Sequence, residues 1–236
     1  MKITTLLSPA MFDASISDID RKIVVVIDIL RATSTMTVAM ENGARAIYPV
    51  RDIETAYRAG TSFVKAGERN GEKVDGFDLG NSPREFLPDI VGNRDIVMTT
   101  TNGTRAISMS EHAQEILIAS YRNIDATLNY LNNSKEDVVL FCSGWKDLVN
   151  VEDTLFAGEL AYRLQENGYE IENDATHVAM AVFLQHQNNL NDIVKKASHA
   201  QRITRLASSE DIDLCLMRNT FHEALKVVEG VVVVAS

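Results

Sequence analysis

Four loops rich in hydroxyl, amide and guanidinium groups have the composition of an anion-binding site. Each loop follows a short apolar run, and the four loops are Asp28–Thr35, Gly67–Gly71, Thr99–Thr104 and Cys142–Gly144. In open α/β sheets the ligand crevice lies outside the carboxyl ends of the strands, where such loops converge on one small molecule. The sequence therefore predicts one oxyanion site shared by these loops.

The loop Asp28–Thr35 carries groups suited to phosphate and to a divalent cation. Free amides at a helix N-terminus favour a bound anion, and Arg31 can hold phosphate through two parallel N–H groups. The carboxylate that opens the loop is a hard oxygen ligand suited to Mg²⁺. We expect substrate contacts from its hydroxyls on Thr33, Ser34 and Thr35. The alternative is that the carboxylate and the first hydroxyl only cap the helix.

The stretch Gly67–Pro83 is more polar than a connector requires. It is rich in turn residues and ends at Asn81 and Ser82, which we expect to contact substrate at the start of a helix. Ser82 before Pro83, with Glu85 following, predicts an N-cap and a capping box. The alternative is a surface excursion with ordinary turn chemistry.

The threonine-rich loop Thr99–Thr104 is predicted to surround substrate oxygens with amides and hydroxyls. The residues expected to bind are Thr101, Asn102, Gly103 and Thr104. The loop lacks the spacing of a Walker loop or a dinucleotide fingerprint, so the sequence indicates no nucleotide cofactor.

The fourth loop begins at Cys142 and is followed by two adjacent acids, Glu152 and Asp153, at a predicted helix start. The acids either bind metal or complement the positive end of the helix dipole, with Asn150 as cap. Cys142 is either a nucleophilic thiolate or a small buried hydrophobe.

Residues outside the loops favour structural roles. Two histidines, His177 and His186, have the wrong spacing for one shared metal site, and the other three have no obvious ligand neighbours. Packing is the favoured role of Trp145, with a place in a pocket as the alternative.

Composition and charge argue against a nucleic-acid-binding, a secreted or a membrane-spanning protein. The chain has 236 residues and a formal net charge of -10, with no basic stripe, which argues against a nucleic-acid partner. Two distant cysteines are typical of a reducing compartment. No run approaches the length of a membrane span, and no signal peptide is recognisable, so we expect a cytoplasmic protein.

Strand-like and helix-like segments alternate along most of the chain, which predicts an α/β fold: a mostly parallel sheet with helices on both faces. Pro49 favours an edge position for one of the strands. We expect a single domain over 1–236, and a helical pattern from Asn173 leaves open a C-terminal subdomain over 173–230, before a last β-branched run. The expected strands are Ile23–Ile27, Ala46–Val50, Phe63–Ala66, Asp95–Thr99, Glu115–Ala119, Asp137–Phe141 and Val231–Val234.

The loop motifs resemble, in order, those of the 2-phosphosulfolactate phosphatase family. The matching segments are Asp28-x-x-Arg31-Ala-Thr-Ser-Thr, Gly67-Glu-Arg, Gly76-Phe-Asp-Leu-Gly-Asn-Ser-Pro83, Thr100-Thr-Asn-Gly-Thr104, and Cys142-x-Gly with Glu152-Asp153-x-x-x-Ala157-Gly158. The resemblance implies a Mg²⁺-dependent phosphatase that hydrolyses (R)-2-phospho-3-sulfolactate to 3-sulfolactate and phosphate, a step of coenzyme M biosynthesis. Lys146 departs from the pattern, which often has an arginine after the Cys-x-Gly.

The resemblance also suggests roles for individual residues. Mg²⁺ would be held by Asp28 and one or more of Glu68, Glu152 and Asp153, and phosphate would be clamped by Arg31 and Arg69. Three nucleophiles stay open: a metal-bound water, Asp28 or Cys142. Neither an Asp-x-Asp nor a Cys-x5-Arg motif is present, because leucines occupy the decisive positions.

Two alternatives to this function stay open. One is a phosphatase for another small phosphorylated acid, and the other is a non-catalytic module that binds a small anionic phosphate ester. A homodimer is the default expectation for the assembly, because two-fold symmetry is the commonest arrangement.

Overall fold

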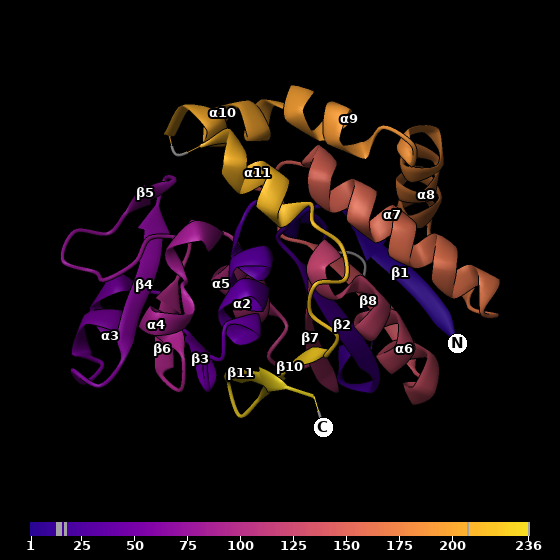
Figure 1. Cartoon of the computed structure of the whole chain (residues 1–236). Coiled ribbons are helices and arrows are strands. Elements are labelled where there is room, and N and C mark those ends of the chain that lie inside the picture. Colours follow the sequence, from indigo (N-terminus) through magenta and orange to yellow (C-terminus); the bar gives the residue numbers. More distant parts are fainter. Residues whose placement is uncertain (13–15, 17, 207, 236) are drawn as a thin grey trace.

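The computed structural model describes residues 1–12, 16, 18–206 and 208–235, and these form an α/β fold around one large sheet (Figure 1). The sheet has eleven strands in the order β5-β4-β6-β3-β11-β10-β7-β2-β8-β1-β9. Their bounds are β1 Lys2–Leu6, β2 Lys22–Ile27, β3 Ala46–Pro49, β4 Val64–Arg69, β5 Glu72–Lys73, β6 Asp95–Thr99, β7 Glu115–Ala119, β8 Asp137–Cys142, β9 Glu170–Ile171, β10 Leu225–Val228 and β11 Val231–Val234. The predicted fold class is confirmed.

Helices connect and cover the strands. Their bounds are α2 Ala32–Glu41, α3 Ile53–Arg58, α4 Pro88–Val91, α5 Gly103–Met109, α6 Ile124–Ser134, α7 Val151–Glu166, α8 Asp174–His186, α9 Leu190–Lys196, α10 Ser198–Leu206 and α11 Ser209–Cys215. Alternate residues of β2 enter two different cores: Val25 packs with α6 and α7, and Val24 packs with α2. This alternation is expected for a strand that is buried on both faces.

The sheet consists of two parallel halves joined by an antiparallel hairpin. One half contains β4, β6 and β3, and the other contains β7, β2, β8, β1 and β9. The hairpin β10–β11 pairs with β7 on one side and with β3 on the other. The predicted edge position of β3 is therefore wrong. Pro49 is tolerated because it is the last residue of β3, beyond the single pairing of Ile47 with Val232.

The predicted capping box at Ser82 is also wrong. Pro83–Glu85 forms only one turn of 3₁₀ helix, and the Ser82 side chain makes no cap hydrogen bond. Its hydroxyl instead donates to Asp211 Oδ1 at 2.7 Å, and Glu85 accepts from the amide of Gly80 at 2.7 Å. Both side chains therefore bind other parts of the fold.

The C-terminal helices lie across one end of the sheet. In Figure 1, α9, α10 and α11 run over the end toward which β4 points. Residues of α8 to α11, such as Met180, Val194 and Ala200, belong to the same core as β2 and β8. Among the described residues, no helix has both the length and the apolar character needed to cross a membrane.

Candidate active site

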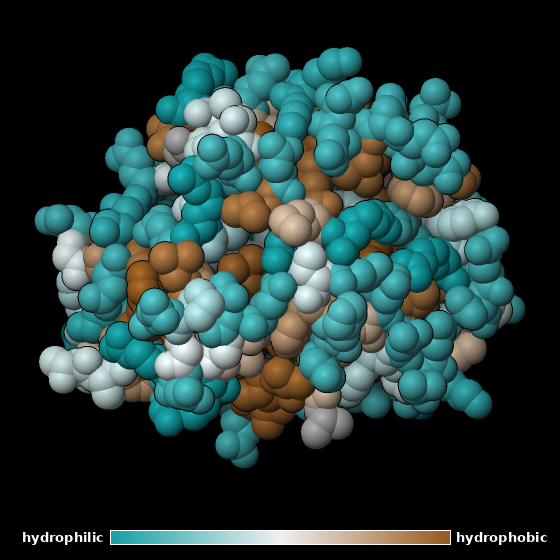
Figure 2. Space-filling model, in the orientation of Figure 1, coloured by the Kyte–Doolittle hydropathy of each residue, from teal (hydrophilic) through white to brown (hydrophobic). Residues whose placement is uncertain are grey.

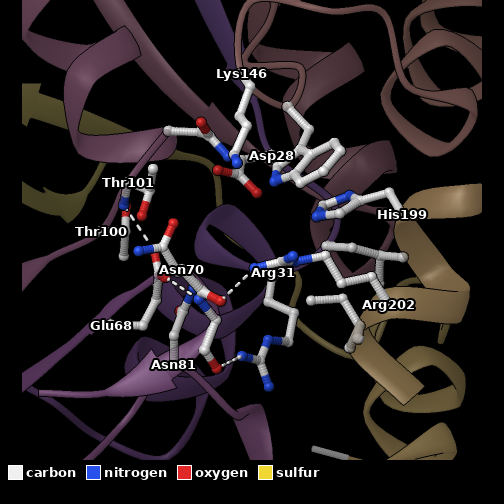
Figure 3. A pocket seen from close by; sticks show the side chains of 15 residues that line it. Asp28, Arg31, Glu68, Asn70, Asn81, Thr100, Thr101, Lys146, His199 and Arg202 are labelled. Atoms are coloured by element: carbon white, nitrogen blue, oxygen red, sulfur yellow. Dashed lines mark hydrogen bonds between the residues drawn. The ribbon is translucent and has the colours of Figure 1, made fainter. Parts of the chain in front are cut away.

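A pocket lies between the strand-end loops and α10 (Figure 3). Residues that follow β2, β4, β6 and β8 form most of it, as expected for ligand crevices of open α/β sheets. Predicted site residues that line it are Asp28, Arg31, Glu68, Asn81, Thr101 and Asn102. Trp145, for which a place in a pocket was the alternative to packing, also lines it. Lining residues that were not among the predicted site residues include Asn70, Thr100, His199, Arg202 and Ile203.

Asp28 is the buried carboxylate at the end of β2, with 5% of its surface exposed. Its Oδ1 accepts from the amide of Ala32 at 3.2 Å. Burial raises the pKa of Asp28 to about 6; neighbouring Glu68 and Glu152 raise it further, whereas His199 and the Ala32 amide oppose the rise. A raised pKa in a pocket is typical of functional carboxylates.

The backbone at Gly103 lies so close to Asp28 and Ala32 that a side chain there would collide with both. A Cβ at that position would lie 2.9 Å from Asp28 Oδ2 and 2.6 Å from the Cβ of Ala32. Gly103 therefore admits Asp28 to the site rather than lining the pocket itself.

Glu68 connects two of the predicted loops. Its Oε1 accepts from the amide of Thr101 at 2.6 Å, and its Oε2 accepts from the amide of Gly71 at 2.6 Å. The neighbouring Arg69 lies outside the pocket lining and donates to Thr99 Oγ1 and to backbone carbonyls. The structure thus places Glu68 at the site and gives Arg69 a structural contact.

Arg31 is buried, with 4% of its surface exposed, and lines the pocket. Its Nη1 donates to Asp211 Oδ2 at 2.5 Å, and Ser82 binds the other oxygen of Asp211. Its Nε has no hydrogen-bond partner among the described residues. Asp211 thereby holds the guanidinium in place, and the Nε–H group remains available to a ligand.

The hydroxyls predicted to bind substrate after β2 are used within the fold. Thr33 donates to the carbonyl of Asp28, Ser34 to that of Ile29 and Thr35 to that of Asn81. None of these three residues lines the pocket, because α2 is buried along Ala32–Met40. They hold the loop and do not face a ligand there.

Thr104 is likewise occupied with the backbone. Its hydroxyl donates to the carbonyl of Thr100 at 2.9 Å and accepts from the amide of Thr100 at 3.2 Å. Thr101, in contrast, lines the pocket with its Oγ1 buried and unpartnered among the described residues. Of the four residues of this loop that were predicted to bind, Thr101 and Asn102 line the pocket, and Gly103 and Thr104 do not.

Cys142 is fully buried and does not line the pocket. Burial raises the pKa of its thiol well above the ordinary value, and the nearby Asp153 and Glu152 carboxylates raise it further. A neutral thiol inside the core is not a nucleophile. The structure thus places Cys142 at the end of β8 in the core, which favours its alternative role as a small buried hydrophobe.

Asp153 is a structural carboxylate. Its Oδ1 accepts from Ile29 N at 2.9 Å, and its Oδ2 accepts from Gly144 N and from Asn150 Nδ2. Burial raises its pKa well above the ordinary range, with Asp28 and Glu152 adding to this effect. Asp153 thus joins two loops and the start of α7, and both of its oxygens are engaged away from the pocket lining.

Glu152 is fully buried and pairs with His199 on α10. Glu152 Oε1 lies 2.5 Å from His199 Nδ1, whereas Oε2 has no hydrogen-bond partner among the described residues. The Trp145 ring stacks on His199, with centroids 5.9 Å apart and planes at 17°. Lys146 and Arg202 lie over the Trp145 ring, at 5.1 and 5.2 Å from its centroid.

Unpartnered buried atoms around the pocket are its clearest sign of a ligand. Arg31 Nε, Asn81 Oδ1 and Thr101 Oγ1 all belong to lining residues, and each lacks a hydrogen-bond partner among the described residues. Buried polar groups are nearly always satisfied in native proteins, by protein, water or ligand. The pocket therefore offers donors and an acceptor to a polar ligand.

The carboxylates of the pocket fit Mg²⁺ only as a partial ligand set. Within the described ranges, no three His, Cys, Asp or Glu side chains converge closely enough to enclose a metal ion. Mg²⁺, however, commonly takes one or two carboxylates and completes its shell with water and substrate oxygens. Asp28 and Glu68 line the pocket and match that requirement, whereas Glu152 and Asp153 lie outside the pocket lining.

A parallel sheet with a polar pocket at its strand ends defines an α/β protein that binds a small molecule. Comparisons with known proteins specify the class. The model of the 2-phosphosulpholactate phosphatase family matches residues 10–230. Proteins named probable 2-phosphosulfolactate phosphatase are similar along most of their length. The one from Thermotoga maritima is 39% identical over 219 residues, which cover 92% of this chain and 94% of that protein.

A second such relative, from Caldanaerobacter subterraneus, is 37% identical over 220 residues, which cover 91% of each chain. A third, from Microcystis aeruginosa, is 39% identical over 199 residues, covering 81% of this chain and 83% of that protein. The chain belongs to the 2-phosphosulfolactate phosphatase family, and the resemblance seen in its motifs is confirmed.

Proposed function

We propose that this chain is a Mg²⁺-dependent phosphatase that hydrolyses 2-phosphosulfolactate to sulfolactate and phosphate, as in coenzyme M biosynthesis. One observation carries the proposal: the buried Asp28 lines the same pocket as Arg31, Asn81 and Thr101, each of which has a buried polar atom without a partner among the described residues. The names of the relatives support the choice of substrate.

The charges around the pocket suit a substrate with several anionic groups. Arg31 follows β2, Lys146 follows β8 and Arg202 lies on α10, and the last two both lie over the ring of Trp145. A substrate that bears phosphate, sulfonate and carboxylate needs cations at more than one point. Arg31, fixed by Asp211, is the group best placed to stabilise charge that develops on the phosphoryl oxygens.

Asp28 and Glu68 are the residues that would hold Mg²⁺ beside the phosphate, where the ion neutralises phosphoryl charge. Asp28 then has one of two roles: it orients the attacking water or attacks phosphorus itself. In both roles it must be ionised.

The test is phosphate release from 2-phosphosulfolactate, 2-phospholactate and p-nitrophenyl phosphate, each with Mg²⁺ and with EDTA. Metal-dependent turnover that is fastest with phosphosulfolactate is the expected result. If another ester is turned over fastest, the proposed substrate is wrong but phosphate ester hydrolysis remains the reaction. Binding of these esters without phosphate release would contradict the proposal and indicate an anion-binding module.

A further inference from the structure

His199 is the buried titratable side chain of the pocket that the proposed reaction has not yet used. It lies near the start of α10 with 7% of its surface exposed. Figure 3 shows its ring entering the pocket from α10, on the side opposite Thr100 and Thr101. The ring therefore reaches the pocket from outside the strand-end loops.

Two contacts fix the orientation of this ring. Nδ1 lies 2.5 Å from Glu152 Oε1, and the face of the ring stacks on Trp145. With Nδ1 directed at a fully buried carboxylate, Nε2 is the nitrogen left for the pocket. A carboxylate that binds one ring nitrogen in this way sets the tautomer of the histidine and orients its ring.

Charged groups surround His199 on several elements. Glu152 on α7 and Asp28 at the end of β2 are acidic, whereas Arg202 on α10 and Lys146 after β8 are basic. Glu152 is in direct contact with the ring, and its second oxygen has no partner among the described residues. Glu152 is therefore positioned to balance a positive charge on the imidazole.

The proposed substrate is an ester of a secondary alcohol, and its leaving oxygen is a strongly basic alkoxide. Such a group leaves readily only when an acid protonates it, and positioned acids contribute about 10²- to 10⁴-fold to rate. Resting on the proposed function, we infer that His199 is the catalytic residue that donates this proton from Nε2, with Glu152 as its positioning residue.

In this step, the proton moves to the leaving oxygen as the bond from phosphorus to that oxygen breaks. As the nucleophile's oxygen bonds to phosphorus, the bond from phosphorus to the ester oxygen breaks and its electron pair stays on that oxygen. The Nε2 proton of the imidazolium moves to this oxygen, which leaves as the neutral hydroxyl of the product. Neutral His199 then recovers its proton from water.

The experiment compares H199Q with wild type on two esters of different leaving group. Loss of the acid is expected to lower kcat/KM for 2-phospholactate by about 10²- to 10⁴-fold, because lactate leaves as an alkoxide. The loss for p-nitrophenyl phosphate is expected to stay below about tenfold, because nitrophenolate leaves without a proton. Glu152→Gln should show the same leaving-group pattern with smaller losses.

H177Q is the matched control, because His177 is exposed on α8. Circular dichroism and thermal unfolding establish that the variants fold. Equal losses of H199Q on both esters would overturn the inference, since they would indicate a base or a structural role. If wild type turns over neither these two esters nor 2-phosphosulfolactate, the proposed function itself is contradicted.

If wild type turns over only 2-phospholactate, the role of His199 is tested by the solvent deuterium isotope effect on kcat. An effect that is present in wild type and absent in H199Q supports proton donation by His199. The same effect in both proteins overturns it.

Discussion

The pocket has two sides that differ in how their side chains are held. On the strand-end side, Asp28 and Glu68 accept hydrogen bonds from backbone amides next to the site. On the cover side, His199 and Arg202 come from one helix and are held by side-chain stacking on Trp145 and by contacts with Glu152 and the carbonyl of Asn70. The strand-end side is thus fixed by the fold itself, which suits the reacting groups, whereas the cover side depends on a few side-chain contacts.

The largest effect is expected at Asp28. Asp28→Asn keeps the size of the side chain and an oxygen for the Ala32 amide, but removes the negative charge that the proposed reaction requires. We expect kcat/KM to fall by about 10³-fold or more, with an unchanged circular dichroism spectrum. Asp89→Asn, an exposed control on α4, should keep full activity. Full activity of the Asp28 variant would move the chemistry away from the strand-end side.

Arg31→Lys tests whether the fixed guanidinium matters beyond its charge. Lysine can still pair with Asp211 but has neither the forked geometry nor the free Nε. We expect kcat/KM to fall about 100-fold. Arg69→Lys should lose less than about tenfold, because Arg69 lies outside the pocket lining. Comparable losses in the two variants would restore Arg69 as a phosphate clamp.

The stability of Asp28→Asn should change in the opposite direction to its activity. The folded pKa of Asp28, about 6, lies above its ordinary value of 3.8, so the folded state binds more protons between these values. Wild-type stability therefore falls as pH rises through this window, by about 3 kcal/mol for a shift of this size. In EDTA at pH 7.5, the variant should be the more stable protein by up to about 3 kcal/mol.

This stability difference should vanish as the pH falls to about 3, below the ordinary pKa of 3.8, where Asp28 is mostly protonated in both the folded and the unfolded wild type. Urea unfolding at the two pH values measures it. A variant that is less stable than wild type at pH 7.5 would show that hydrogen bonds at Asp28 outweigh the cost of burying its charge.

The smallest effect is expected on the cover side. Arg202→Met removes a partly buried cation over Trp145 but keeps a long apolar side chain. We expect KM to rise about tenfold or less, with kcat little changed, because a cation at the rim contributes modestly to binding. A large fall in kcat would show that α10 must be held by this contact for the reaction to proceed.

The strand-end side could be predicted because its residues follow strands in recognisable order. Asp28, Glu68 and Thr101 each come just after an apolar run, and parallel strands bring such positions to one edge. Burial within the loops was harder to predict. The hydroxyls of Thr33 and Ser34 look available in the sequence, yet α2 is surrounded by protein and turns them toward carbonyls.

The residues of the cover side could not be predicted from the sequence around them. His199 is separated from its partner Glu152 by 47 positions, and nothing in its own helix identifies it as part of a site. Only the packing of α10 over the strand ends brings the two side chains together. The sequence singled out only Glu152 of this pair, as an acid at a predicted helix start. The structure shows that Glu152 is buried, and a buried carboxylate needs a nearby partner.

A crystal structure of the Asp28→Asn variant with 2-phosphosulfolactate and Mg²⁺ would show directly whether this pocket is the active site. We expect the phosphoryl group in the pocket, within hydrogen-bond distance of Arg31 Nε and Thr101 Oγ1, with the rest of the substrate toward Lys146 and Arg202. A substrate bound elsewhere on the protein, with both of those atoms still unpartnered, would contradict it.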